Sequence, residues 1–349
     1  MKLRFLFRAD SGEGFGHGHS ARVETLARAA KNLGHEAGIA YRRTRGQRRT
    51  ADIFDAVLPL PVRSVAGHAD EASDAIDTLT TAFERRFVPD IVVVDHYGLA
   101  EEWEKTARGF GKFVVALDDI SGRSHAANLV FELVPNDSEG ESAPGGQQDV
   151  IRVRGLEYFP VGHDFGMLPP DWSSPTRNVL VSFGGWDPTG GTLVACEAIA
   201  LLREEAPRRL VTADIVIGEA NQQVDDVRRF VASRPWLLAH SGSPSLAPYM
   251  RRSHLVVCGA GNTLVEAVAA GRAPISVIVA DNQEMLARHL ADAHQACVLM
   301  SPDDVSPQSL ADAIRKSWDA GRSAGTGPID TLGAQRCVAK VLLESGLAR

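Results

Sequence analysis

The sequence predicts an α/β protein made of two Rossmann-like domains, each built on a parallel sheet. Short runs rich in Val, Ile and Leu alternate with longer amphipathic runs, a pattern typical of βαβ units. The alternation breaks once, in a Pro- and Ser-rich stretch at 166–177, and then starts again. A chain of 349 residues also exceeds what one hydrophobic core usually supports, so we expect two domains with a cleft between them.

The N-terminal domain, with the first glycine-rich loop, is expected to span residues 1–165. Its strands are predicted at 3–7, 35–42, 90–95 and 112–119, and its helices at 21–34 and 101–111. The stretch GESAPGGQQ at 140–148 predicts a solvated loop.

The second half repeats the pattern after a linker at 166–177. We expect a ligand-binding domain at 178–325 and a C-terminal helical segment at 326–349. Strands are predicted at 178–183, 213–218, 254–259 and 273–279, and helices at 192–205, 222–233, 263–271 and 282–293.

Composition excludes several classes of protein. The formal net charge is −7, whereas a nucleic-acid-binding protein draws its affinity mainly from a basic face, so no nucleic-acid partner is expected. The sequence contains no run of about 18 apolar residues, so no membrane span is predicted. The apolar stretch near Met1 is too short for a signal peptide. We therefore expect a cytoplasmic protein with reduced, buried thiols at Cys196, Cys258, Cys297 and Cys337.

The loop GEGFGHGHSAR at 12–22 is the first candidate site, because ligands of doubly wound sheets bind at the carboxyl ends of strands. Its glycines let the backbone approach a ligand closely, and the next helix offers unpaired N–H groups. Imidazole suits proton transfer near neutral pH, so His17 and His19 are candidates; a plain tight turn is the alternative. No third ligand has a spacing that suggests a metal site, and we expect no metal and no other cofactor.

Two polar loops are expected to follow buried strands of the same domain. The loop DHYG at 95–98 either lines a pocket or lets Asp95 cap the next helix. The pair Asp118 and Asp119 forms an acid/base pair or a metal site, or else serves as a cap or in a salt bridge.

Two glycine-rich loops of the second half are candidate phosphate-binding turns. In FGGWDPTGG, Gly184 and Gly185 would seat a diphosphate, or the turn would be a helix entry capped by Asp187. In GAGNTLVEAVAAG at 259–271, the start of a helix at Asn262–Thr263 would meet an anion. Glu266 there either reaches a ribose hydroxyl or completes a capping box.

In chain order, these motifs resemble the family of UDP-2,4-diacetamido-2,4,6-trideoxy-β-L-altropyranose hydrolases of pseudaminic acid biosynthesis. They span nearly the whole chain. The motifs are RAD at 8–10, GHGHSAR at 16–22, VVDHYGL at 93–99, LDD at 117–119, GLEY at 155–158, SFGGWDP at 182–188, GAGNTLVEA at 259–267 and NQ at 282–283. The second half also resembles the UDP-binding half of GT-B glycosyltransferases, especially the N-acetylglucosaminyltransferase that completes lipid II.

The resemblance implies a GT-B-like fold, two Rossmann-type domains with parallel sheets facing a central cleft, and metal-independent hydrolysis that releases UDP. Its catalytic histidine, in the family pattern G-x-G-H-x-x-R, falls on His19, and its tyrosine falls on Tyr97; with Asp95 these form the expected catalytic group. The expected substrate-binding residues are Asp10, Gly16, His17, Gly18, Arg22, Asp118, Asn282 and Gln283. The expected nucleotide-binding residues are Gly184, Gly185, Gly218, Gly261, Asn262, Thr263 and Glu266.

The chain departs from the family pattern near the expected ligand. His17 stands where the family usually has a small residue or Thr, Trp186 replaces a small residue, and Gly162 stands where the family often has arginine. Ser20 and Ala21 replace larger apolar residues. These departures leave the sugar and the nucleotide base open.

The expected reaction is attack of water on the anomeric carbon of a nucleotide-diphospho-sugar, with His19 as the base. Backbone donors of the second half would stabilise the leaving diphosphate. Asp10 and Asp95 are both candidates for orienting His19. One alternative is a GT-B glycosyltransferase, but residues 1–165 contain no long apolar run that would bind an acceptor. The other is a non-catalytic nucleotide-sugar binder, which the intact G-x-G-H motif disfavours.

Overall fold

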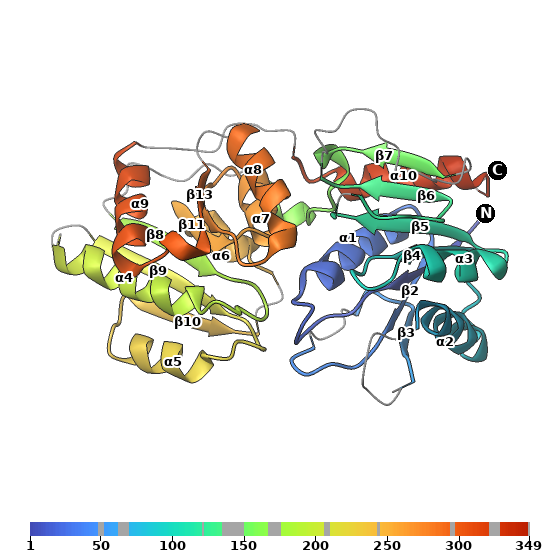
Figure 1. The fold of residues 1–349 in the computed structure, drawn as a ribbon, viewed down its shortest axis with the longest axis horizontal. Coiled ribbons are helices and arrows are strands. Elements are labelled where there is room, and N and C mark those ends of the chain that lie inside the picture. Colours follow the sequence, from blue (N-terminus) through green and yellow to red (C-terminus); the bar gives the residue numbers. More distant parts are fainter. Residues whose placement is uncertain are drawn as a thin grey trace. The chain divides into compact units, whose positions relative to one another are not determined.

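The chain forms two compact units in a computed structural model (Figure 1). The structure describes residues 1–47, 52–61, 70–120, 122–134, 150–166, 176–205, 210–242, 245–293, 297–320 and 329–347. The first unit comprises Met1–Ser11, His19–Pro160 and Leu332–Arg349, and the second comprises Gly12–Gly18 and Val161–Thr331.

The first unit is built on a parallel sheet. Among the described residues this sheet has seven strands in the order β3-β2-β1-β4-β5-β6-β7. The strands are β1 (Arg4–Arg8), β2 (Glu36–Tyr41), β3 (Ala56–Pro59), β4 (Ile91–Val94), β5 (Phe113–Asp118), β6 (Leu129–Glu132) and β7 (Ile151–Arg154). The helices are α1 (Gly18–Asn32), α2 (Glu71–Glu84), α3 (Glu101–Gly109) and α10 (Gly333–Ser345), with a 3-10 turn at Leu156–Tyr158.

The second unit contains another parallel sheet. Its described strands follow the order β10-β9-β8-β11-β12-β13. They are β8 (Thr176–Ser182), β9 (Leu210–Ile217), β10 (Leu237–Ser241), β11 (Leu255–Gly259), β12 (Ala273–Val277) and β13 (Val298–Met300). The helices are α4 (Gly191–Glu205), α5 (Val224–Ala232), α6 (Ala247–Arg252), α7 (Asn262–Ala269), α8 (Glu284–Ala293) and α9 (Pro307–Asp319), with 3-10 turns at His163–Phe165, Asp281–Gln283 and Pro302–Asp304.

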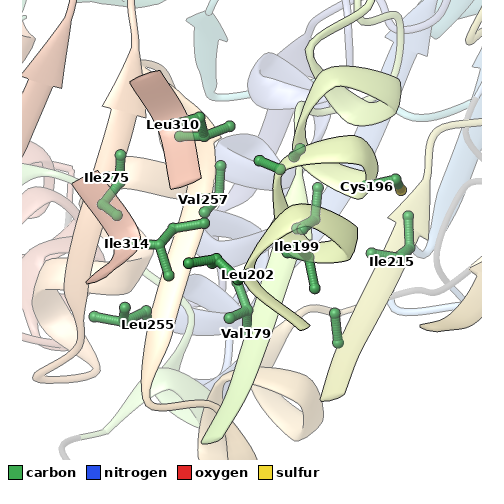
Figure 2. Close-up of a cluster of buried hydrophobic side chains, with 14 of the residues drawn as sticks. Val179, Cys196, Ile199, Leu202, Ile215, Leu255, Val257, Ile275, Leu310 and Ile314 are labelled. Atoms are coloured by element: carbon green, nitrogen blue, oxygen red, sulfur yellow. The ribbon is translucent and has the colours of Figure 1, made fainter. Parts of the chain in front are cut away.

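The core of the second unit lies between the sheet and helices α4 and α9 (Figure 2). Ile199 and Leu202 of α4 and Ile314 of α9 pack on Val179 of β8 and Val257 of β11, and all five side chains are buried. Burying one such side chain stabilises a fold by about 1.5–3 kcal/mol relative to leaving it in water. The apolar residues from which the sequence predicts buried strands therefore also anchor β8 and β11 in the core, and so fix the positions of their ends.

Both sheets have a point where the strand order reverses. In the first sheet β1 lies between β2 and β4, and in the second β8 lies between β9 and β11. Doubly wound sheets bind ligands beyond the carboxyl ends of the strands at this point. In each unit, the loops that follow these strands are therefore the expected position of a ligand-binding site.

The strands and helices predicted from the alternation are all present, with shifted ends. Helix α1 begins at Gly18 and not at residue 21. The predicted linker 166–177 is described only at residue 166 and at Thr176–Arg177, and the latter two belong to β8 because they pair with β9. The predicted loop 140–148 lies outside the described residues.

The last helix differs from the expected arrangement. Helix α10 belongs to the first unit, whereas the sequence predicts a separate C-terminal segment at 326–349. Arg336 Nη1 donates to the carbonyl of Glu157 at 2.9 Å, and Cys337 Sγ lies 3.1 Å from the carbonyl of Tyr158. These contacts fix α10 against the 3-10 turn that ends the first pass of the chain through the unit.

Candidate active site

The carboxyl ends of β1, β4 and β5 bring three acidic residues to one edge of the first sheet. Asp10 lies two residues after β1, Asp95 directly follows β4, and Asp118 ends β5. All three side chains are buried, although a buried carboxylate is costly unless it is paired. Their partners therefore define what the site can do.

His19 is held by Asp95. It lies in the first turn of α1, is 2% exposed, and has its Nδ1 2.6 Å from Asp95 Oδ1. Its Nε2 is buried and has no hydrogen-bond partner within the described ranges. The Tyr97 ring meets the imidazole edge-on, with the ring centroids 4.3 Å apart. Since buried polar atoms are normally paired, this Nε2 is a candidate hydrogen-bonding partner for a ligand.

Arg22 fixes the carboxylate that fixes His19. One turn along α1 from His19, it donates from Nε to Asp95 Oδ2 at 2.9 Å and from Nη2 to Asp95 Oδ1 at 2.7 Å. Its Nη1 donates to Asp119 Oδ2 at 2.6 Å. Burial opposes the charge on Asp95, but the Arg22 guanidinium and the His19 ring hold the pKa of this carboxyl well below its usual range. The sequence predicts Arg22 to bind substrate, whereas the structure engages it with carboxylates of the protein.

The partners of His19 determine its tautomer. Two groups lie near His19 Nδ1: Asp95 Oδ1 at 2.6 Å and Arg22 Nη2 at 2.9 Å. An ionised Asp95 can only accept a hydrogen bond, and Arg22 Nη2 already donates to Asp95, so the shorter contact assigns the proton of a neutral His19 to Nδ1. Nε2 then carries a lone pair. Burial, together with the Asp119 carboxylate, raises the pKa of Tyr97 strongly, so its phenol stays neutral. The arrangement is that of a general base oriented by a carboxylate.

Asp10 belongs to a neighbouring pair. Arg8 donates to its two oxygens from Nη1 at 2.6 Å and from Nη2 at 3.0 Å. His96 Nε2 lies 3.2 Å from Asp10 Oδ2. Of the two carboxylates that the sequence offers for orienting His19, the one that contacts the ring is therefore Asp95. Asp10, predicted to bind substrate, accepts hydrogen bonds from the protein.

Asp118 is engaged in a buried charge cluster. Its Oδ2 lies 2.9 Å from His125 Nε2, and His125 Nδ1 lies 2.7 Å from Glu104 Oε1. Burial opposes the imidazolium, but the two carboxylates outweigh it and raise the pKa of His125 to about 9. Asp118 Oδ1 accepts from the backbone N–H of Ile120 at 3.1 Å. Both oxygens of Asp118, also predicted to bind substrate, are thus occupied by the protein.

The glycine-rich loop is a tight hairpin. The N–H of Gly12 donates to the carbonyl of Gly16, and the N–H of Gly16 donates to that of Gly12, each at 2.8 Å. The φ angles of Gly12, Gly14 and Gly16 are 109°, 82° and 65°, a region that glycine adopts without steric cost. The glycine density of this loop is explained by its hairpin geometry.

The end of this loop contacts predicted nucleotide-binding residues within the second unit. The Gly18 carbonyl accepts from Asn262 Nδ2 at 3.0 Å. A Cβ added to Gly185 would lie 2.8 Å from the His17 ring, so the ring lies directly on this glycine. Gly18, His17, Gly185 and Asn262, which the sequence selects separately, are thus near neighbours.

The Gly184–Gly185 turn packs backbone to backbone with Gly218. A Cβ at Gly218 would lie 2.3 Å from both carbonyl oxygens of the turn, which excludes any side chain there. Asp187 accepts from the N–H groups of Gly191 and Thr192 at 2.9 and 3.0 Å, at the start of α4. The capping alternative for Asp187 is confirmed, and the glycine turn remains a candidate phosphate seat.

The loops after β11 and β12 adjoin one another. Gly261 is the N-cap of α7 and makes no side-chain cap hydrogen bond, so Thr263 does not form the capping box considered for it with Glu266. A Cβ at Gly261 would lie 3.3 Å from Gln283 Nε2. Asn282 shares the 3-10 turn Asp281–Gln283 with Gln283. Thr263, Gly261 and Gln283 therefore lie at the same edge of the second sheet.

Three residues of the site escaped the sequence reasoning. His96 stands in the motif DHYG but was not selected, and its position after a strand was the available signal. Asp119 was predicted together with Asp118, and its ion pair with Arg22 agrees with the salt-bridge alternative. Arg8 lies at the end of an apolar strand, where a buried cation is not expected. His125 has no local signal, because its partner Glu104 is distant in the sequence.

The structure offers no evident cation site among the residues it describes: no group of three or more His, Cys, Asp or Glu there could hold a metal ion. Nor does any described helix combine the length and apolar character needed to cross a membrane.

Sequence comparison finds one distant relative. No known protein-family model matches the chain. An uncharacterized protein of Methanocaldococcus jannaschii is 23% identical over 207 residues, which cover 56% of this chain and 41% of that protein. The match thus spans less than half of the relative's length.

Solved structures match over nearly the whole chain. MurG of Acinetobacter baumannii has a TM-score of 0.57 at 17% identity, with 98% of this chain and 100% of that chain covered. UDP-GlcNAc 2-epimerase of Neisseria meningitidis, bound to UDP-GlcNAc, has a TM-score of 0.63 at 13% identity and coverages of 99% and 100%. UDP-GlcNAc 2-epimerase of Methanocaldococcus jannaschii, in complex with UDP-GlcNAc and UDP, has a TM-score of 0.63 at 11% identity. The match covers 98% of this chain and 100% of that chain.

The chain has the GT-B fold. At these identities the likeness establishes the fold alone, and the predicted α/β class with two parallel sheets is confirmed.

Proposed function

We propose that this protein hydrolyses a nucleotide-diphospho-sugar, with a UDP-sugar as the first candidate. The observation that carries the proposal is His19, whose Nδ1 is fixed by Asp95 while its buried Nε2 has no partner among the described residues. A neutral imidazole in this state suits removal of a proton from water. Support for a UDP-sugar comes from epimerases of the same fold that were solved with UDP-GlcNAc.

In the proposed reaction, a water oxygen attacks the anomeric carbon while the bond from that carbon to the diphosphate oxygen breaks. The electrons of the broken bond leave with the nucleoside diphosphate, and the water proton goes to His19 Nε2. Asp95 stabilises the imidazolium that forms. Attack opposite to the leaving group inverts the anomeric configuration. A base of this kind contributes about 10²–10⁴-fold to the rate.

The leaving diphosphate is a good leaving group and needs charge stabilisation more than a proton. We assign this role to backbone N–H groups of the Gly184–Gly185 turn and of the first turn of α7. Support comes from the N-cap Gly261, which has no side-chain cap hydrogen bond to compete for those N–H groups. Glu266 is proposed for the ribose, by the usual geometry of dinucleotide-binding folds. Asn282 and Gln283 are proposed for the sugar, as the resemblance to pseudaminic acid pathway hydrolases implies.

A GT-B glycosyltransferase is the second candidate, because solved glycosyltransferases share the fold. The same base would then deprotonate a hydroxyl of an acceptor instead of water. The two functions differ in what attacks the anomeric carbon, and a single labelling experiment separates them.

The test is incubation with a panel of UDP- and other nucleotide-sugars in ¹⁸O-labelled water, with EDTA and no acceptor. The first compound is UDP-2,4-diacetamido-2,4,6-trideoxy-β-L-altropyranose. We expect ¹⁸O in the free sugar and none in the nucleoside diphosphate. Intact substrates that turn over once lipid or glycan acceptors are added would instead favour the transferase.

The role of His19 is tested by the variant His19→Asn. We expect kcat to fall by about 10²–10⁴-fold. The matched control is His35→Asn, which changes a histidine just beyond the opposite end of α1 and should leave kcat unchanged. Wild-type turnover in His19→Asn would refute the assignment of the base.

A further inference from the structure

The proposed mechanism leaves one carboxylate of the site without a role. Asp119 follows β5, and its Oδ2 accepts from Arg22 Nη1 at 2.6 Å and from the Tyr97 hydroxyl at 3.3 Å. Its side chain is 12% exposed, whereas that of Arg22 is 3% exposed. Asp119 does not touch His19 directly but is joined to it through Arg22 and Asp95.

The charges of these four residues do not balance when His19 is neutral. Asp95 and Asp119 are two carboxylates against one guanidinium, Arg22, so the cluster carries one net negative charge. A proton on His19 Nε2 would neutralise it. Without Asp119, the Arg22–Asp95 pair would already be neutral, and the same proton would leave a buried positive charge, which is costly.

The other groups that face His19 in the first unit do not supply this charge. Tyr97, from the loop after β4, stays neutral because its pKa is raised. Burial lowers the pKa of His96, whose ring stacks 6.4 Å from that of His19, so it too is neutral near pH 7. Asp10, at the end of β1, lies beyond His96 and is paired with Arg8.

We propose that Asp119 is a positioning residue that acts on His19 through Arg22. It binds the guanidinium edge that Asp95 leaves open, which holds Arg22 and Asp95 in place. It also gives the cluster the negative charge that a proton on His19 neutralises. The kinetic part of this inference rests on the proposed hydrolysis, whereas the electrostatic part does not.

The test is a ¹⁵N NMR titration of the full-length, ¹⁵N-histidine-labelled protein, with the His19 signals assigned from their absence in His19→Gln. In wild type, we expect the neutral ring to carry its proton on Nδ1. In Asp119→Asn, the imidazolium loses a stabilising charge, so the titration midpoint of the ring should fall by about one pH unit. Asp119→Glu, which keeps the charge, should return the midpoint to within about 0.3 pH units of wild type.

Asp77→Asn is the matched control. Asp77 has an 11% exposed side chain and accepts from Arg42 Nη2 at 3.1 Å, and the same arginine also binds the carboxylate of Asp74. The variant therefore removes a similarly placed charge from an arginine that does not contact His19. We expect a midpoint shift of less than about 0.2 pH units, since the lost charge faces a different arginine. The thermal unfolding of Asp119→Asn is first compared with that of wild type by circular dichroism. If the two differ, Asp119→Ser, which removes the same charge, takes the place of Asp119→Asn in the titration.

Kinetics separate this inference from the proposed function. If hydrolysis is observed, the acid limb of the plot of kcat/KM against pH should move to lower pH in Asp119→Asn, by the same amount as the NMR midpoint, because the base must be neutral to act. A shifted NMR midpoint in a protein without hydrolase activity would support the inference and reject the proposed function. Hydrolysis with an unshifted midpoint, or a shift no larger than that of Asp77→Asn, would overturn the inference.

Discussion

His125 should make the stability of the first unit depend on pH in the alkaline range. Its ring nitrogens lie 2.7 Å from Glu104 Oε1 and 2.9 Å from Asp118 Oδ2, in a buried position. Both contacts need an N–H donor, so the ring must carry both protons. The variant His125→Gln removes the titrating group and keeps a polar side chain.

The size of the effect follows from the two protonation equilibria. The pKa of His125 is raised from 6.5 to about 9 in the folded protein. Because the folded pKa is the higher one, the stabilisation is fully present below pH 6.5 and is lost as the pH rises through 9. One pKa unit corresponds to about 1.4 kcal/mol. The contribution of the shift to the free energy of unfolding is therefore about 3 kcal/mol at pH 6.5, about 1.4 at pH 8 and about 0.2 at pH 9.5.

The assay is urea unfolding of wild type and His125→Gln at these three pH values. Unfolding is followed by ¹⁹F NMR of fluorotryptophan-labelled protein at Trp103, which is buried in the first unit beside His125's partner Glu104. The measured quantity is the difference in unfolding free energy between the two proteins, so groups that titrate equally in both cancel. We expect this difference to shrink by about 3 kcal/mol from pH 6.5 to pH 9.5.

A difference that stays constant across this range would refute the reasoning, because it would mean that His125 is not an imidazolium in the folded protein. A difference that grows with pH would have the wrong sign for a raised pKa and would refute it as well.

Two further predictions concern the second unit. Gly218→Ala should lower its free energy of unfolding by about 2 kcal/mol or more in urea denaturation, because the new methyl group meets the Gly184–Gly185 carbonyls. The control is Gly109→Ala in the first unit, which adds a methyl in open space at the end of α3 and should leave the stability unchanged or raise it by up to about 1 kcal/mol. Equal stability of the two variants would contradict the packing argument. Asp187→Ala should raise the unfolding rate and lower the free energy of unfolding by about 1–2 kcal/mol, because the cap of α4 is lost. Asp187→Asn should recover at least half of this loss, and no recovery would mean that the cap does not stabilise the helix.

The sheets could be predicted because their central strands are continuous apolar runs. Ile91–Val94 and Leu255–Gly259 are buried throughout and read directly as parallel strands. Three strands of the first sheet were missed: β3 and β7 at its edges and β6, Leu129–Glu132, which is buried but only four residues long. At the edges, burial does not impose a continuous apolar pattern. Ile151–Arg154 alternates apolar residues with arginines and has no fully buried residue, and Ala56–Pro59 is short and ends in proline.

The candidate site could be predicted in outline but not in its pairings. The polar residues after buried strands identify the edge of the sheet that holds His19, Asp95 and Tyr97. Which carboxylate meets which cation depends on register and on helix rotation, which local patterns do not encode. Arg22 therefore looks like a ligand-binding arginine in the sequence, whereas the structure joins it to Asp95 and Asp119.

The return of the chain to the first unit has a consequence for the order of folding during synthesis. Helix α10 packs against residues Glu157 and Tyr158, yet it is translated after the whole of Val161–Thr331. Most of the second unit leaves the ribosome as one continuous stretch, whereas the first unit lacks helix α10 until Gly333–Ser345 has been translated. Domains usually complete their folding in the order of synthesis. Here the unit that begins first should be the last to reach its native packing, and nascent chains that stop short of α10 should expose that surface to chaperones.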